Sequence, residues 1–205
     1  MAERNQENQK RVHVFRHLPK ESGKSKNVIG LSMPLSKKGR EVAKELANQF
    51  LAKNGKPQMI AASVCVRTYQ AGMIFAEVCD APLPSIERRL VGAYQNWERL
   101  ISLVSEEPTA LDFYKVDPSF ILNEAVSVLD TLLDFAIRLK PGENAVCFSH
   151  GGLIEPTVAL AKARICGKST IDLAETFPKD LKEGEGVVFF FDNNNDLVTV
   201  KKQNE

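Results

Sequence analysis

The chain has 205 residues and a formal net charge of +1 at pH 7, and 43% of its residues are hydrophobic while 26% are charged. These values are typical of one globular domain that buries a sizeable core without disulfides or metal. The balanced charge argues against a nucleic-acid partner held by bulk charge. No apolar run approaches the roughly 18 residues of a membrane span, so we expect no membrane partner.

The four cysteines show neither CxxC nor zinc-type spacing, which favours buried, reduced thiols and a cytoplasmic location. The polar residues 1–10 lack a signal-peptide core. We therefore expect a short disordered tail followed by a single domain over residues 11–205.

Hydrophobic periodicity predicts strands that alternate with helices along most of the chain. In chain order, we expect a strand at 12–15, a loop at 18–35, a helix at 36–53, a strand at 58–66, helices at 67–78, 87–107 and 118–139, a strand at 144–149, a helix at 152–162 and a hairpin of strands at 186–192 and 196–201. This alternation predicts a mostly parallel sheet covered on both faces, a three-layer α/β/α fold. The helical stretch at about 85–140 interrupts the alternation and is expected to form a small helical cap.

Cationic and imidazole side chains follow the predicted strands. Arg16 and His17 end the first strand, Arg67 follows the second, and His150 with Gly151 follows a later one. The carboxyl ends of parallel strands are where α/β proteins bind ligands. Guanidinium groups, imidazoles and a helix N-terminus together favour a doubly charged anion such as a phosphoryl group. The spacing suggests no metal ligand set, and we expect no cofactor.

Four motifs in order resemble the histidine phosphatase superfamily, the phosphoglycerate mutase-like proteins. They are Arg-His after the first strand, PLSKKGREVAKELA, ASVCVRTYQAG and SHGG. The resemblance runs from about residue 11 to 157 and weakens between 85 and 140. It implies the phosphoglycerate mutase-like fold and a metal-independent phosphatase that hydrolyses phosphomonoesters.

The resemblance also implies roles for individual residues. His17 matches the histidine that is phosphorylated during turnover, and Arg16 and Arg67 match arginines that bind phosphate. His150 matches the second pocket histidine, which holds the transferring phosphoryl group, and the backbone N–H of Gly151 adds a donor.

Two features depart from the family pattern. The family's glycine after Arg-His is Leu18 here, and a side chain at this turn is expected to narrow the pocket or tilt His17. The general acid is expected in IERRLVGAYQNWE, where Glu87 is the first candidate and Glu98 the second.

Three functions remain open at this stage. The first is hydrolysis through a phosphohistidine, the second is mutase-type phosphoryl transfer by the same residues, and the third is a catalytically weak protein that binds a phospholigand. In each case the partner is a small phosphorylated molecule, whose identity would depend on the cap and on loop 18–35. Two other titratable groups are expected to be structural: His13 in the first strand and Glu155 at a helix start.

Overall fold

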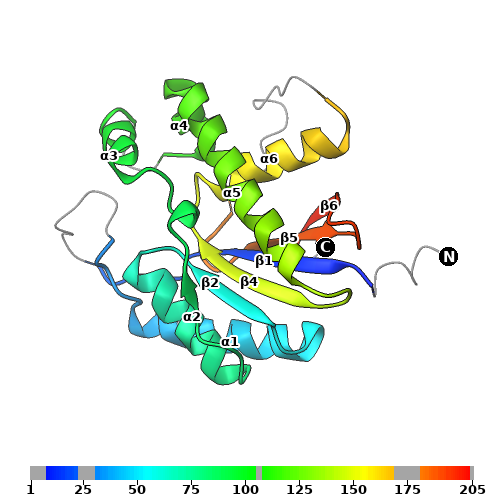
Figure 1. Cartoon of the computed structure of the whole chain (residues 1–205). Helices are drawn as coiled ribbons and strands as arrows, with labels where there is room; N and C mark the ends of the chain where they lie inside the picture. The colour runs from blue at the N-terminus through cyan, green and yellow to red at the C-terminus, as the bar shows by residue number, and fades with distance from the viewer. Residues whose placement is uncertain (1–7, 23–30, 105–107, 169–180, 204–205) are drawn as a thin grey trace.

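In the part of the chain that the computed structural model describes (residues 8–22, 31–104, 108–168 and 181–203), six strands form one sheet. They are β1 (Lys10–Arg16), β2 (Met59–Ala62), β3 (Ser85–Ile86), β4 (Asn144–Ser149), β5 (Gly186–Phe191) and β6 (Leu197–Lys202). Their order in the sheet is β3-β2-β4-β1-β5-β6. Helices cover both faces, so the predicted three-layer α/β architecture is confirmed (Figure 1).

The sheet is mixed but mostly parallel. The pairs β1–β4, β2–β4 and β2–β3 are parallel, whereas β5 pairs antiparallel with both β1 and β6. The predicted C-terminal hairpin is therefore present as β5 and β6. In the register of the central pair, Arg16 lies opposite Ser149. Since each of these residues precedes a histidine, the pairing brings His17 and His150 to the same edge of the sheet.

One face of the sheet packs against α1 (Lys37–Asn54) and α2 (Val66–Val78). The Ser36 side chain caps α1 by accepting a hydrogen bond from the backbone N–H of Gly39 at 3.0 Å. A Cβ at Gly39 would lie 2.0 Å from the Pro19 carbonyl oxygen, so this position requires glycine. The close approach holds the start of α1 against the segment that follows His17.

The other face packs against α5 (Pro118–Arg138) and α6 (Ile154–Ile165), which contact each other extensively. Figure 1 shows α5 crossing over the strands β4 and β1. One face of α5 is apolar and lies in the core, where Ile121, Ala125, Val128, Leu132 and Phe135 are all buried. No helix in the described ranges is both long and apolar enough to cross a membrane.

The predicted helix over 87–107 is wrong. The chain instead forms a short 3-10 turn, η2 (Arg88–Leu90), and then α3 (Tyr94–Ser102). The break falls at Gly92, whose φ of 74° is in the left-handed region, and a Cβ there would lie 2.3 Å from a carboxylate oxygen of Glu124. A further helix, α4 (Ala110–Val116), was not predicted.

The segment expected as a cap is divided among three parts of the fold. Its first residues form β3 in the sheet, and its last helix is α5 in a layer, which leaves α3 and α4. Trp97 of α3 and Phe113 of α4 meet edge to face at 5.1 Å, and both lie within 3.5 Å of the Cβ position of Gly152. The two short helices therefore pack against the SHGG turn.

The predicted tail of residues 1–10 is too long at its C-terminal end, because Lys10 already belongs to β1. Residues 1–7 lie outside the described part of the chain, as do residues 23–30 of the predicted loop. The four cysteines are free, and three of them are buried, namely Cys65, Cys79 and Cys147.

Leu18 allows a direct test of the α1–α2 side of the core. Its side chain is fully buried beside Leu35 and Phe15. Replacing it with alanine removes about three carbon atoms from a packed site, so Leu18→Ala is expected to lower the free energy of unfolding by about 2–5 kcal/mol. Urea denaturation measures this, with Leu83→Ala as a control because Leu83 is 71% exposed. Equal effects of the two substitutions would contradict the buried placement of Leu18.

Candidate active site

The two histidines that follow β1 and β4 lie side by side. The His17 backbone N–H donates to the Ser149 carbonyl oxygen at 2.9 Å, which extends the β1–β4 pairing past the end of the strands. The ring centroids of His17 and His150 are 5.5 Å apart. The structure therefore brings together the two imidazoles expected at the site.

The hydrogen bond of the His17 ring indicates its tautomer. Its Nδ1 lies 3.2 Å from the Leu18 carbonyl oxygen. Because a carbonyl oxygen only accepts, Nδ1 carries the hydrogen and Nε2 keeps its lone pair. Burial, followed by the positive charges of Arg67 and Arg16, lowers the pKa of His17 to about 3. The ring is therefore neutral at physiological pH, as nucleophilic attack on phosphorus requires.

His150 is held through both ring nitrogens. A guanidinium nitrogen of Arg67 lies 3.2 Å from Nδ1, and the Ser63 hydroxyl oxygen lies 2.8 Å from Nε2. Since a guanidinium only donates, Nδ1 accepts and Nε2–H donates to Ser63. Burial and the nearby charge of Arg67 lower the pKa of His150 well below its usual value. To donate to a phosphoryl oxygen, His150 must exchange one of these two partners.

Ser63 was not among the predicted site residues. It lies just after β2 and before the start of α2, and its hydroxyl oxygen is 2.8 Å from that of Thr68. The signal that could have indicated Ser63 is its place as the first residue of the S-x-x-x-R turn that ends at Arg67. The turn thus supplies both a cation and the group that fixes the orientation of His150.

Arg16 packs directly on the SHGG turn. A Cβ at Gly151 would lie between 2.7 and 2.9 Å from three atoms of the Arg16 guanidinium group. The absence of a side chain at Gly151 is therefore what admits this guanidinium. Arg16 also donates to the Leu181 carbonyl oxygen, which directs it along the turn.

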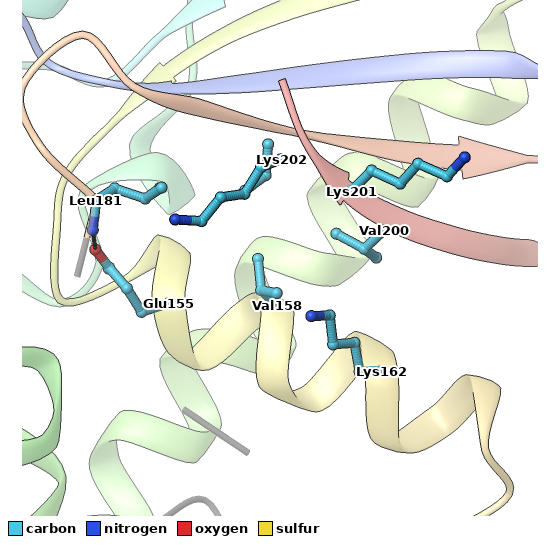
Figure 2. Close-up of a pocket in the computed structure, with 8 residues that line it drawn as sticks. Glu155, Val158, Lys162, Leu181, Val200, Lys201 and Lys202 are labelled. Carbon is cyan, nitrogen blue, oxygen red and sulfur yellow. Dashed lines mark hydrogen bonds between the residues drawn. The ribbon is translucent and has the colours of Figure 1, made fainter. Parts of the chain in front are cut away.

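Glu155 connects the SHGG turn to the backbone at Leu181 from within the core. Its side chain accepts hydrogen bonds from the backbone N–H groups of Gly152 at 2.8 Å and Leu181 at 3.0 Å, and the second bond is drawn in Figure 2. Burial raises the pKa of Glu155 although these backbone bonds oppose the shift. Glu155 lies in the first turn of α6, as expected of a residue that stabilises a helix start, and it also fixes the backbone that holds Arg16.

Glu87, the first candidate for the general acid, is paired with a neighbouring cation. Arg89 donates to its carboxylate through Nε at 3.2 Å and also reaches Asp134 of α5 at 3.1 Å. Burial raises the pKa of Glu87, but the hydrogen bonds from Arg89 outweigh it and the net pKa is lowered. Glu98, the second candidate, lies on α3 beside Trp97.

Leu18 and His13 are both accommodated in the core. The Leu18 side chain lies in the apolar cluster under α1 instead of in the anion site, and its carbonyl oxygen serves His17. His13 is 2% exposed and meets the Phe50 ring edge to face at 4.8 Å. Burial lowers the pKa of His13 to about 4.

Two further charged residues reach the site, and neither was predicted as a site residue. Lys20 is close enough to Arg67 and Arg16 for their charges to lower its pKa, after the larger effect of burial. Glu183 lies before β5 with a carboxylate oxygen 3.6 Å from Nδ1 of His17. Within the described residues, no group of three or more His, Cys, Asp and Glu side chains is arranged to hold a metal ion.

The three histidines of the chain predict an acid-sensitive fold. All have lowered pKa values in the folded state, so below about pH 6.5 the unfolded chain takes up protons that the folded chain does not. The free energy of unfolding should therefore fall between pH 6.5 and 5, by up to about 1.4 kcal/mol per pH unit for each histidine. Urea denaturation at several pH values measures this slope. His13→Leu removes one of the three groups and should reduce the slope by up to about 1.4 kcal/mol per pH unit. A flat profile over this range would contradict the prediction.

Comparison with known proteins gives matches to solved structures, whereas no family model and no curated protein matches the chain. The protein histidine phosphatase SixA, solved with tungstate, is 13% identical over 93% of this chain and 94% of its own, with a TM-score of 0.61. A mycobacterial glucosyl-3-phosphoglycerate phosphatase is 16% identical over 95% and 97%, with a TM-score of 0.66. YhfR of Bacillus stearothermophilus is 15% identical over 96% and 97%, with a TM-score of 0.65. The chain therefore has the phosphoglycerate mutase-like fold of the histidine phosphatases.

Proposed function

We propose that this protein is a metal-independent phosphatase that hydrolyses a small phosphomonoester through a phosphohistidine at His17. The observation that carries the proposal is the geometry of His17: its Nδ1 lies 3.2 Å from the Leu18 carbonyl oxygen, which leaves Nε2 without a hydrogen, and its ring lies 5.5 Å from that of His150, which is bonded to Arg67. Two of the structural neighbours are phosphatases by name, and one of them was solved with tungstate, an oxyanion. The buried free thiols fit a reducing, cytoplasmic location.

In the first half-reaction, Arg16 and Arg67 bind the equatorial oxygens of the phosphoryl group. Nε2 of His17 attacks phosphorus in line, the N–P bond forms and the P–O bond to the leaving alcohol breaks. Glu87 donates a proton to the leaving oxygen. His150 becomes a further donor when Arg67 turns toward the anion and the freed Nδ1 takes up a proton.

In the second half-reaction, water attacks the phosphorus of phosphohistidine. Its proton passes to the Glu87 carboxylate, the N–P bond breaks and inorganic phosphate leaves. For Glu87 to act first as an acid, the bound dianion must favour its protonated form against the pull of Arg89, and the negative charge of the substrate works in that direction.

The second candidate function is the binding of a phospholigand without turnover. The ion pair between Glu87 and Arg89 favours it, because a carboxylate held in this way is a poor proton donor. In that case the arginines and His150 would still bind phosphate, which thermal unfolding with and without phosphate would reveal.

The first test is hydrolysis of p-nitrophenyl phosphate from pH 5 to 8 in the presence of EDTA. Turnover is expected to continue with EDTA and to fall to the uncatalysed rate in His17→Ala, because the variant has no atom to accept the phosphoryl group. Stabilisation by phosphate should persist in the variant, which shows that it is folded. Full activity in His17→Ala would sink the proposal, and no turnover in the wild type with stabilisation by phosphate would favour the binding protein.

The second test identifies the proton donor. Glu87→Gln is expected to reduce kcat for an alkyl phosphate such as glycerol phosphate by about 10²–10⁴-fold. The rate of the first burst of nitrophenolate from p-nitrophenyl phosphate should change much less, because nitrophenolate leaves without a proton and this step precedes the one in which Glu87 acts as a base. Glu98→Gln is the matched control and should change neither rate. A large loss of kcat for the alkyl phosphate in Glu98→Gln, with little change in Glu87→Gln, would instead identify Glu98 as the general acid.

A further inference from the structure

The carboxylate of Glu183 lies beside the His17 ring, 3.6 Å from its Nδ1. It lies in the turn from Lys182 to Glu185, where the Glu185 N–H donates to the Lys182 carbonyl oxygen at 3.0 Å. The same turn is bonded to the end of β1, because the Arg16 N–H donates to the Glu185 carbonyl oxygen at 2.9 Å and the Gly184 N–H to that of Arg16 at 3.3 Å. Gly184 has a φ of 82°, which lets the chain reverse beside β1. The backbone of β1 therefore positions Glu183 next to His17.

Three cations of the described residues act on His17. Arg16 precedes it on β1, Arg67 reaches it from α2, and Lys20 lies on the segment that follows. His150 is neutral on its other side. Among the described residues, Glu183 is the acidic side chain found within ion-pair distance of the ring, and its own side chain is 38% exposed.

We propose, on the basis of the proposed function, that Glu183 is a positioning residue that stabilises the positive charge His17 acquires when it is phosphorylated. In the resting site the ring is neutral, with its hydrogen on Nδ1 shared toward Leu18. When Nε2 bonds to phosphorus, Nδ1 keeps that hydrogen and the ring becomes cationic. A carboxylate near Nδ1 attracts the charged ring more strongly than the neutral one, so it favours the transition state over the ground state.

The same charge assists the second half-reaction. When water attacks phosphorus and the N–P bond breaks, a ring that still carries its Nδ1 hydrogen leaves as neutral imidazole. A ring that has lost this hydrogen would have to leave as imidazolate, a much poorer leaving group. Glu183 thus keeps the proton on Nδ1 while Arg16, Arg67 and Lys20 act to remove it.

The position of Glu183 separates this role from that of the general acid. Nδ1 and Nε2 lie on opposite sides of the imidazole ring, and the leaving oxygen lies beyond phosphorus in line with Nε2. A carboxylate beside Nδ1 is therefore on the far side of the ring from the leaving group. It acts through His17 and does not donate a proton to the alcohol.

The experiment follows the lifetime of the phosphoenzyme at pH values from 5 to 8. The full-length protein is mixed with p-nitrophenyl phosphate, quenched in alkaline detergent to preserve the N–P bond, and examined by intact-protein mass spectrometry. In Glu183→Gln, decay of the phosphoenzyme is expected to be about tenfold slower at pH 7. The pH at which the decay rate falls to half its maximum should be about one unit lower than in the wild type. Glu183→Asp, which keeps the charge, should restore most of the rate.

Glu185→Gln provides the matched control, because it removes the same charge from the same turn at a residue whose carboxylate accepts from the Lys182 backbone. It should leave the pH profile unchanged. If the wild type forms no phosphoenzyme, the proposed function itself is wrong. If the wild type forms it and Glu183→Gln decays with the wild-type profile, only the role of Glu183 is overturned, and the same holds if Glu185→Gln shifts the profile equally.

Discussion

The parallel pairing of β1 with β4 is the constraint on which the site depends. It places Arg16 opposite Ser149, and the next residue on each chain is a histidine. The bond from the His17 N–H to the Ser149 carbonyl oxygen continues this register into the site, so the distance between the two rings is set by backbone geometry. A slip of this pairing by one residue would turn the side chains of a buried strand to the opposite face, which the two apolar layers do not permit.

Burial keeps the rings of His17 and His150 uncharged. Their rings lie among guanidinium groups and away from water, and both effects disfavour protonation. Under the proposed function, the cations that would bind a phosphoryl group therefore also help to keep His17 neutral. Glu155 contributes from the core, because its buried carboxylate joins Gly152 to the Leu181 backbone against which Arg16 lies. The fold and the electrostatics of the site thus depend on the same few contacts.

The sequence was sufficient to predict the architecture and four of the side chains that meet at the site. Arg16, His17, Arg67 and His150 lie at strand ends or helix starts, where periodicity and glycine spacing leave clear signals. Contacts between distant segments were not predicted. The pairing of Glu87 with Arg89 and Asp134 depends on how η2 packs against α5, and the placement of Glu183 depends on a turn bonded to the end of β1. The helix predicted at 87–107 was wrong for a similar reason, since its break at Gly92 is a close approach to a residue of α5.

The bond between Arg67 and His150 has a consequence for how a ligand enters. An anion that draws Arg67 toward itself takes the donor away from Nδ1 of His150, and the lone pair left behind would face the oxygens of the anion. This arrangement is unfavourable unless the ring gains a hydrogen. Under the proposed function, binding of the anion would therefore be linked to the uptake of a proton from the solvent.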